Sequence, residues 1–416
     1  MSKTLMIKAM VLGAVACAFS ATGFAADVQN GHGQGIADST TEVNAAKHEA
    51  VRSNWMDRID IVVGVGMKDS KEMHTQHHTV FTVPRTDLHT VTSKNSKSTE
   101  INKLYIETLQ PITHYDENAK SVVFVQGRIG RSGEKISSYK LDGYLEPARP
   151  AGTFIRHDKQ TDTKESLGMN ANIGIGYRRL SKGEHAYVGV NAFYDHVFKG
   201  GYKRVSGGVE YVAGLNEFHA NLYRNLGTDD RKYIGLHGRS VVLGDPAGLY
   251  PYGMDPDQSL YNYGVAAYEN HWMLSEKVAA SGFDVGYSRT FKNARWARVY
   301  ADYYNWRGRE AVKVGYYKLP KRDAIKGFKV GAEFHITPHL TLDAGYKTAS
   351  HHLSGPYATL KYTIGTSKFA WRGGKHSESA ITTARSKMLD KVHRSDMVVQ
   401  ETVEETYDHG VVDVGL

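Results

Sequence analysis

The chain has 416 residues, of which 41% are hydrophobic, and its formal net charge is +8. After the N-terminus it contains no run of about 18 apolar residues, so membrane-spanning helices are not expected. No nucleic-acid-binding motif accompanies the positive charge, and nucleic acid is therefore not an expected partner. The same composition suits a soluble protein or a membrane β-barrel, because half of each barrel strand faces a polar lumen.

Residues 1–25 have the organisation of a secretory signal peptide. A basic start with Lys3 and Lys8 is followed by a short apolar stretch and by small residues before the expected cleavage site. Cleavage would also remove Cys17, the only cysteine. Lipoprotein processing at that cysteine is an alternative, but the residues before it match the required sequence poorly. The polar residues 26–56 are expected to form a periplasmic linker.

Residues 57–365 alternate between apolar and polar side chains, which places all the apolar side chains of a strand on one face. The apolar face often ends in tyrosine, where the aromatic girdle of a membrane barrel would lie. Each segment has about the 9–11 residues that a tilted strand needs to cross a bilayer. Strands are expected at 57–67, 101–112, 120–130, 168–179, 185–196, 203–213, 216–226, 281–291, 296–306, 327–336, 339–348 and 355–365.

The connections between these twelve segments alternate in length. Those after the second, fourth, sixth, eighth and tenth segments are all short. Most of the others are long, namely 68–100, 131–167, 227–280 and 307–326, and only 197–202 and 349–354 depart from the rule. Outer-membrane barrels have short periplasmic turns and long outer loops, whereas a soluble sandwich has no reason to sort its loops in this way. The pattern favours an all-β, antiparallel transmembrane barrel with both ends in the periplasm, closed by pairing of the first and last strands.

The polar faces of these strands are expected to line the lumen. They carry charges of both signs, which could bind one another across strands or bind a polar segment passing through the barrel. The lumen-facing residues expected from the alternation are Arg178, Asn191, Asp195, Glu210, Arg298, Asp302, Lys329, Glu333, Asp343 and Lys347.

The alternation stops after residue 365. Residues 376–394 have apolar side chains near helical spacing, including Met388, Leu389 and Val392, and are expected to form a helix. Residues 397–416 are expected to be extended.

No catalytic constellation is visible. The sequence has no G-x-S-x-G, H-E-x-x-H or Walker motif, so no enzymatic activity and no cofactor are expected. His74, His77 and His78 could bind zinc or copper, but a solvated polar loop is the more ordinary interpretation, and no metal site is assigned.

Several segments resemble the β-domain of the intimin and invasin group, the inverse autotransporters. The most recognisable is GVNAFYDHVF at 189–198, with GGVEY after it. SGFDVGYSRTF at 281–291 and KVGAEFHITPHLTLDAGYK at 329–347 resemble later strands of that domain. SKMLDKVHRSDMVVQE at 386–401 is similar to the segment that follows its last strand.

The resemblance implies a twelve-stranded barrel in the outer membrane of a Gram-negative bacterium. A linker then runs back through the lumen and carries a C-terminal passenger to the cell surface. In this chain 366–416 would be the lumen linker and a short tail, with Met388, Leu389, Val392 and Arg394 in the lumen. Fewer than twenty residues follow Val399, so the Ig-like passenger of the family is not expected here. Class membership also implies outer-membrane lipid, periplasmic chaperones and the barrel-assembly machinery as partners.

Three functions are compatible with these observations. The first is a translocator and anchor barrel with only a vestigial passenger. The second is an adhesion module that uses its long outer loops to bind a ligand on a host or neighbouring cell. The third is a passive pore, which would form if the linker left the lumen.

Overall fold

The computed structural model describes most of the chain from Trp55 onward. The described residues are 55–80, 85–116, 118–148, 153–227, 230–242, 263–314, 317–319, 321–350, 354–365 and 384–415. The expected signal peptide and nearly all of the expected periplasmic linker lie outside these ranges. Within them, no helix is long and apolar enough to cross a membrane.

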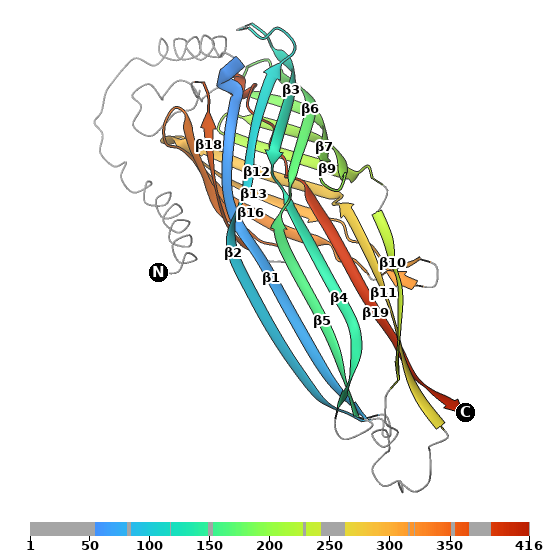
Figure 1. Ribbon diagram of the computed structural model, residues 1–416. Coiled ribbons are helices and arrows are strands. Elements are labelled where there is room, and N and C mark those ends of the chain that lie inside the picture. The colour runs from blue at the N-terminus through green and yellow to red at the C-terminus, as the bar shows by residue number, and fades with distance from the viewer. Residues whose placement is uncertain are drawn as a thin grey trace.

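Twelve strands form a closed antiparallel barrel (Figure 1), as the alternation predicted. Neighbouring strands pair in chain order, and β1 pairs with β18 from Asp60↔Thr363 to Val65↔Ala358, so the barrel part of the sheet has no free edge. The barrel strands are β1 (Ile59–Val80), β2 (Arg85–Pro111), β3 (Ser121–Arg131), β6 (Met169–Leu180), β7 (Ala186–Val197), β8 (Lys203–Ala213), β9 (Asn216–Asn225), β12 (Gly282–Phe291), β13 (Ala294–Trp306), β16 (Ile325–His335), β17 (Leu340–Lys347) and β18 (Gly355–Thr363).

The two faces of the barrel strands differ in the way that a lipid environment requires. On β7 the side chains of Val188 and Val190 are 57% and 54% exposed, whereas Asn191 and Asp195 are 8% and 4% exposed. A soluble protein would bury the valines instead. The exposed apolar face therefore contacts lipid, and the polar face encloses the lumen.

Glycines on the lumen face make room for aromatic rings. A Cβ atom on Gly174 would lie 2.2 Å from the ring of Phe193, and one on Gly176 would lie 2.2 Å from the ring of Phe124. The glycines of the polar face thus leave space for large aromatic side chains to pack against the inner face of the barrel wall.

Three of the long connections predicted as loops are largely strand. β1 and β2 continue far beyond the barrel as one hairpin. The connection 131–167 contains β4 (Glu134–Ala148) and β5 (Thr153–Ser166). The connection 227–280 contains β10 (Asp230–Val242) and β11 (Tyr263–Ala279). A small hairpin, β14 (Val312–Val314) with β15 (Tyr317–Leu319), lies between β13 and β16. We call this side of the barrel the hairpin end and the opposite side the short-turn end.

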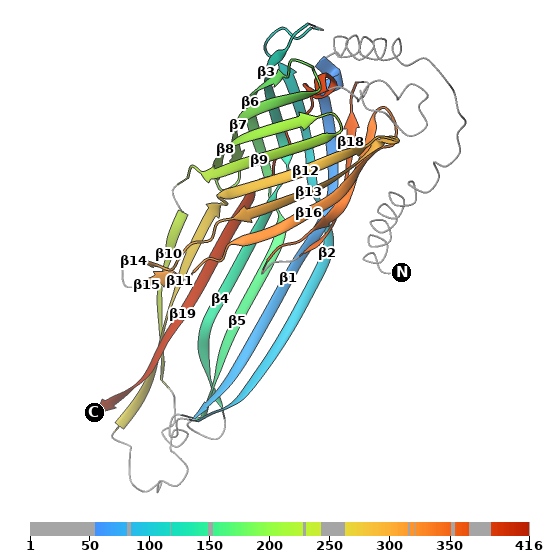
Figure 2. The ribbon, with the colours of Figure 1, turned by 180° about the vertical axis from the view of Figure 1, so that it is seen from behind.

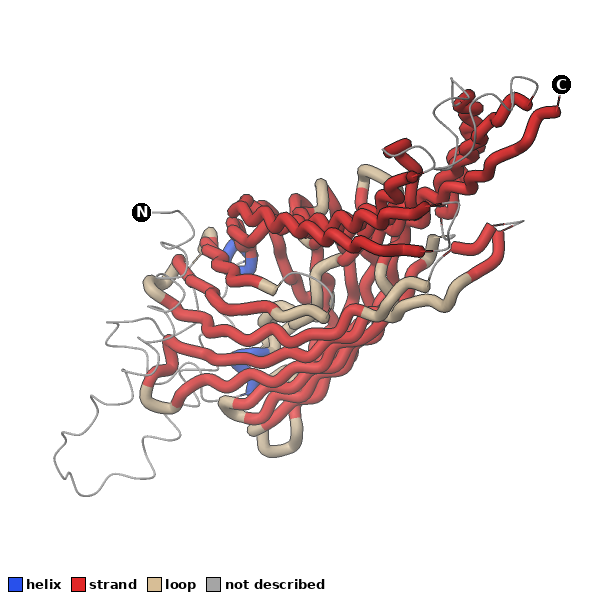
Figure 3. The backbone as a smooth tube through the Cα atoms, turned by 90° about the horizontal axis from the view of Figure 1, so that it is seen from below, coloured by secondary structure: helices blue, strands red, loops and turns tan. Residues whose placement is uncertain are grey.

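Beyond the barrel these hairpins join into one extension sheet, whose strand order is β2-β1-β5-β4-β19-β11-β10. The inserted strand, β19 (Val398–Gly415), runs parallel to β4 and antiparallel to β11. Figures 1 and 2 show the sheet leaving the barrel obliquely, with the C-terminus at its far end. Figure 3 shows the C-terminal strand reaching well beyond the curved barrel wall.

The helix predicted at 376–394 is wrong where the structure describes it. Residues 376–383 lie outside the described ranges, and Ala384–Lys387 form a single 3-10 turn, η4. Residues 391–397 have no regular structure. The cause is competition for backbone groups. Arg178 donates to the carbonyl oxygens of Met388 and Asp390, and the Val392 amide donates to Gln126, so wall side chains replace bonds within a helix.

Candidate functional site

The segment 384–397 runs through the lumen from the short-turn end to the hairpin end. We call it the lumen linker. It begins with η4, which contacts the turns at the short-turn end, and it leads directly into β19 at the other end. Its side chains and backbone contact the inner faces of the barrel strands along the way, and these contacts are the candidate functional site.

Arg385 holds the linker where it enters the barrel. Its guanidinium makes a bidentate ion pair with Glu184, at 2.7 Å for the shorter contact, and donates to the carbonyl oxygen of Ala119 at 2.6 Å. The Tyr115 hydroxyl donates to the Arg385 carbonyl at 3.2 Å. Burial raises the pKa of the Tyr115 phenol to about 12, so this donor stays protonated.

An apolar cluster holds the next turn of the linker. Ala384, Met388, Leu389 and Val392 are all at most 6% exposed. They pack against wall side chains that point into the lumen from β2, β3, β6, β7 and β8, namely Leu109, Val122, Phe124, Leu180, Tyr187, Phe193 and Val212. The linker is therefore held by burial of apolar surface as well as by charge.

Met388 is fully buried in this cluster, so shortening it should be costly. We expect Met388→Ala to lower the free energy of unfolding by about 2–5 kcal/mol, because the lost methylene contacts leave a cavity. Urea titration of the protein refolded into lipid vesicles would measure this. Met388→Leu, which conserves volume, should cost less than about 1.5 kcal/mol, and equal losses in both variants would contradict close packing here.

Arg178 connects the wall to the linker backbone. It is fully buried and pairs with Glu210 at 2.5 and 3.0 Å. Its remaining nitrogen donates to the carbonyl oxygens of Met388 and Asp390 at 2.9 and 2.6 Å. All these hydrogen bonds are charge-assisted and shielded from water, which strengthens them.

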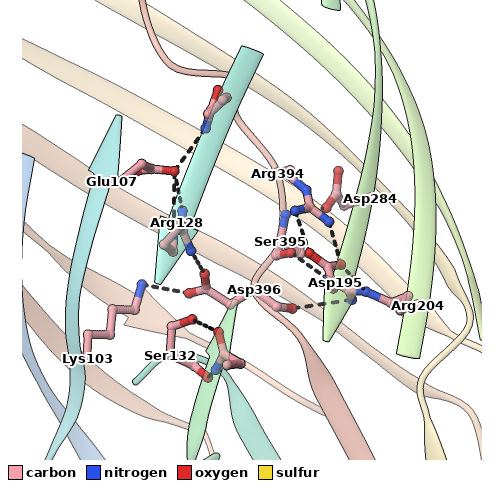
Figure 4. A network of polar contacts seen from close by, with 12 residues as sticks. Lys103, Glu107, Arg128, Ser132, Asp195, Arg204, Asp284, Arg394, Ser395 and Asp396 are labelled. Atoms are coloured by element: carbon pink, nitrogen blue, oxygen red, sulfur yellow. Dashed lines mark hydrogen bonds and ion pairs between the residues drawn. The ribbon is translucent and has the colours of Figure 1, made fainter. Parts of the chain in front are cut away.

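The tightest network surrounds Arg394, Ser395 and Asp396 (Figure 4). Arg394 forms a bidentate pair with Asp195 at 2.7 and 2.6 Å, and Arg204 reaches the same carboxylate at 2.8 Å. Arg204 also donates to the Ser395 carbonyl at 3.1 Å. One buried carboxylate thus holds one arginine of the wall and one of the linker.

Asp396 reaches the opposite side of the lumen. Its carboxylate lies 2.5 Å from the Arg128 guanidinium and 2.9 Å from the Lys103 ammonium (Figure 4). The Ser395 amide donates to Asp284 at 3.0 Å and to the Tyr223 hydroxyl at 2.8 Å. Three consecutive linker residues therefore contact strands from much of the barrel circumference, which fixes the register at which the linker lies in the lumen.

A second charge cluster lies nearer the short-turn end. Arg298 pairs with Glu217 at 3.1 Å and with Glu333 at 2.5 Å. Lys387 of the linker reaches Glu217 at 2.7 Å, and His393 lies 3.0 Å from Arg298. The wall again provides a carboxylate to a linker cation, Lys387.

The predicted lumen residues fall into three groups. Arg178, Asp195, Glu210, Arg298 and Glu333 belong to the charge networks described above. Asn191 is buried, but its side-chain atoms have no hydrogen-bond partner among the described residues. The others line the remaining cavity of the lumen, namely Asp302, Lys329, Asp343 and Lys347.

That cavity has a volume of about 270 Å³ and lies on the side of β1, β2, β13 and β16–β18. The apolar cluster of the linker occupies the side of β2, β3 and β6–β8 instead. Lys329 rests over the rings of Tyr300 and Tyr357 there, at 4.7 and 5.1 Å from their centres. Pore activity stays a prediction, to be measured by planar-bilayer recording.

Several residues of the site were not predicted. Arg204 and Glu217 continue the lumen-facing alternation of β8 and β9, so extending the pattern towards the strand ends would have found them. Lys103 and Arg128 lie on predicted strands to which no faces were assigned. Asp396 follows the end of the predicted helix, and only its place within the segment 386–401 marked it.

At the hairpin end, β19 is held by backbone pairing and by Glu401. This carboxylate lies 2.7 Å from Lys135 of β4, contacts Lys277 of β11, and accepts from Ser137 at 3.3 Å. Behind it, Val399 is fully buried in a small apolar cluster. The strand is thus attached to both of its neighbours.

Reversing the charge of Glu401 should loosen β19 without unfolding the barrel. We expect Glu401→Lys to remove two partly exposed ion pairs, each about 0.2–1 kcal/mol, and to add repulsion with Lys135 and Lys277. Limited proteolysis should then cleave residues after 397 several times faster. Glu401→Gln keeps the size and some hydrogen bonding, so it should have a smaller effect; indistinguishable cleavage of all three proteins would contradict the contact.

Of the histidines 74, 77 and 78, the structure describes the side chain of His74 alone. His74 lies 3.0 Å from His157 of β5, nitrogen to nitrogen. The side chains of His77 and His78 lie outside the described residues. Among the residues described, no group of three or more His, Cys, Asp or Glu is placed to hold a metal ion.

The match to a family model agrees with this architecture. Residues 159–396 match the family described as inverse autotransporter, β-domain. No curated protein matches the chain. One similar solved structure, from a study of in-meso crystallization of membrane proteins, is 13% identical, covers 82% of this chain and 100% of its own, and has a TM-score of 0.42.

Two further solved structures are autotransporter domains. The translocator domain of NalP from Neisseria meningitidis is 11% identical over 78% of this chain and 97% of its own, with a TM-score of 0.22. The β-domain of the Bordetella autotransporter BrkA is 9% identical over 72% and 99%, with a TM-score of 0.21.

A closed barrel with a lipid-facing apolar surface and its own chain held in the lumen defines a translocator or anchor barrel of the outer membrane. The family match covers more than half of the chain and includes most of the lumen linker. The chain belongs to the inverse autotransporter β-domain family.

Proposed function

We propose that this barrel carries its own C-terminal segment outward through its lumen and displays it as β19, the strand that completes an extracellular extension sheet. The observation that supports this most directly is the continuous path of the chain. Arg385 is held at the short-turn end, residues 388–397 lie in the lumen, and β19 pairs on both sides with strands at the hairpin end.

The orientation rests on the lengths of the connections. The short turns at 181–185, 214–215 and 292–293 are all at one end, and the long hairpins are all at the other. Barrels of the outer membrane place short turns in the periplasm, so the extension sheet would lie outside the cell. Secretion through the predicted signal peptide 1–25, followed by handling by periplasmic chaperones and the barrel-assembly machinery, is part of the same proposal.

In this proposal the C-terminal segment is a structural part of the surface sheet. Without β19, the extension would divide into a four-stranded part and the isolated hairpin of β10 and β11. An isolated two-stranded hairpin is only marginally stable in water. Export of β19 would therefore complete the extracellular part of the molecule.

An epitope tag after Leu416 tests the orientation. Antibody should bind this tag on intact cells, because β19 ends at the tip of the extension sheet (Figure 2). A matched tag between Gly214 and Leu215, in a tight turn at the short-turn end, should be detected only after the outer membrane is permeabilised. The reverse pattern, or a C-terminal tag that needs permeabilisation, would refute the proposal.

Binding to another surface is a second candidate function, and the extension sheet favours it. Among the strands that the structure describes, Arg85–Lys103 of β2 pair with β1 alone, because β3 begins to pair only at Leu104. Such an edge can bind an extended segment of a ligand. Replacing residues 71–95 with an Asn-Gly turn removes the outer hairpin; unchanged attachment of expressing cells would argue against this function.

A further inference from the structure

Three aromatic side chains form a cluster on the outward face of the barrel at the hairpin end. They are Phe283 of β12, Tyr303 of β13 and Phe328 of β16. The ring centres of Phe283 and Tyr303 lie 6.0 Å apart, and those of Tyr303 and Phe328 lie 5.1 Å apart. They alternate with lumen-facing neighbours, and Phe328 is 55% exposed. Outward aromatic rings near the ends of barrel strands mark the boundary between membrane and water.

Three cationic side chains follow this cluster towards the hairpin end. Arg224, Arg307 and Lys326 are all exposed and share the outward face. Gly282 pairs with Tyr223, so Arg224 lies beside Ser281. The carbonyl oxygen of Ser281 in turn accepts a hydrogen bond from the Arg307 amide at 2.7 Å. Two strand spacings therefore separate the arginines, about 10 Å. Lys326 is opposite Asn305, two residues before Arg307.

Unlike the cations of the lumen, these three cations have no counter-ion among the described residues. Among the described residues, none of the three side chains makes an ion pair or a hydrogen bond. Two exposed acids lie three residues away in sequence, Glu310 from Arg307 and Asp323 from Lys326, and Asp323 lies 3.9 Å from Lys321. The patch is continuous with exposed apolar side chains of the lipid face, including Leu222 at 66%.

We propose that Arg224, Arg307 and Lys326 bind phosphate groups of lipid in the outer leaflet of the membrane. Guanidinium groups bind phosphate with two parallel hydrogen bonds, and an ammonium adds a point charge. The spacing of the arginines suits a glycolipid that carries two phosphates. The aromatic cluster beneath them would contact the boundary between its head group and acyl chains, which a free phosphate could not use.

The inference depends on the proposed orientation, since the reverse orientation would place the patch in the inner leaflet. The two proposals nevertheless fail separately. If the C-terminal tag is exposed on intact cells but the patch retains no lipid, only this inference fails. If the tag is periplasmic, the orientation fails regardless of any lipid binding.

The test uses the full chain, purified in detergent and titrated with diphosphoryl lipid A, with retention measured by native mass spectrometry. The double variant Arg224→Gln, Arg307→Gln should bind about thirtyfold more weakly, since each basic residue near a charged lipid surface contributes about fivefold. Lys326→Gln alone should weaken binding about fivefold. A shift in gel mobility on heating, equal to that of the unmodified protein, confirms that each variant is folded.

The matched control is the double variant Arg179→Gln, Arg289→Gln. These arginines are also exposed on the outward face, but they lie at the short-turn end. The control should retain the glycolipid. Equal loss in both double variants would mean non-specific attraction, and no loss in either would mean that the patch is not a site. If millimolar inorganic phosphate displaced the bound glycolipid as effectively as competing lipid does, the patch would be a simple anion site. Any of these three results overturns the proposal.

Discussion

Replacing Asp195 with asparagine should lower the free energy of unfolding by about 3–5 kcal/mol and release the linker from the wall. The Asp195 carboxylate is 4% exposed and neutralises two arginines, Arg204 of β8 and Arg394 of the linker. Removing one partner of a buried ion pair leaves an uncompensated charge, which costs far more than the pair itself contributes. Here two guanidinium groups would lose their shared counter-ion at once.

Two measurements separate the parts of this effect. Urea titration in lipid vesicles reports the loss of barrel stability. Proteolytic cleavage after residue 397 reports release of the linker and of β19. The unheated protein must still migrate on the gel as a folded barrel. The variant should show both, because Arg394 belongs to the linker and Arg204 also donates to the Ser395 carbonyl.

Asn191→Ala is the matched control. Asn191 lies on the same strand as Asp195 and is also buried on the lumen face, but its amide has no hydrogen-bond partner among the described residues. Truncating it should change stability by no more than about 1 kcal/mol, and a small stabilisation is reasonable because an unsatisfied polar group is removed. A loss as large as that of the Asp195 variant would show that the lumen wall is merely intolerant of change.

The barrel itself could be predicted because lipid imposes a strict pattern on its strands. Every residue of β7 must face either hydrocarbon or the lumen, and Val188 and Asn191 differ accordingly. The extension sheet obeys no such rule. Residues 91–99 of β2 are exposed one after another, so no alternation distinguishes this strand from a polar loop.

For the lumen linker, the sequence predicts the buried side chains but not the backbone conformation. Met388, Leu389 and Val392 have helical spacing and do form one apolar surface, as expected for the lumen. Their backbone conformation is decided by partners that lie more than 150 residues away in the chain, such as Arg178 and Gln126. A local pattern contains no information about those donors. The charge pairs of the site are non-local as well, since Asp396 and Arg128 lie 268 residues apart in the chain.

Replacing Arg178 with methionine should separate the stability of the wall from the holding of the linker. The single variant leaves Glu210 buried without its cation and removes two hydrogen bonds to linker carbonyl oxygens. We expect it to lose about 3–5 kcal/mol of unfolding free energy and to expose the linker to protease. The double variant Arg178→Met, Glu210→Leu replaces the ion pair with apolar side chains, which is often close to neutral for stability.

The double variant should therefore regain most of the barrel stability, yet its linker should stay more sensitive to protease than in the unmodified protein. Neither new side chain can donate to the carbonyl oxygens of Met388 and Asp390, which Arg178 satisfies in the native barrel. Recovery of both properties together would mean that the apolar cluster alone holds the linker. Recovery of stability alone would assign Arg178 two roles, as the partner of Glu210 within the wall and as the donor that holds the lumen linker.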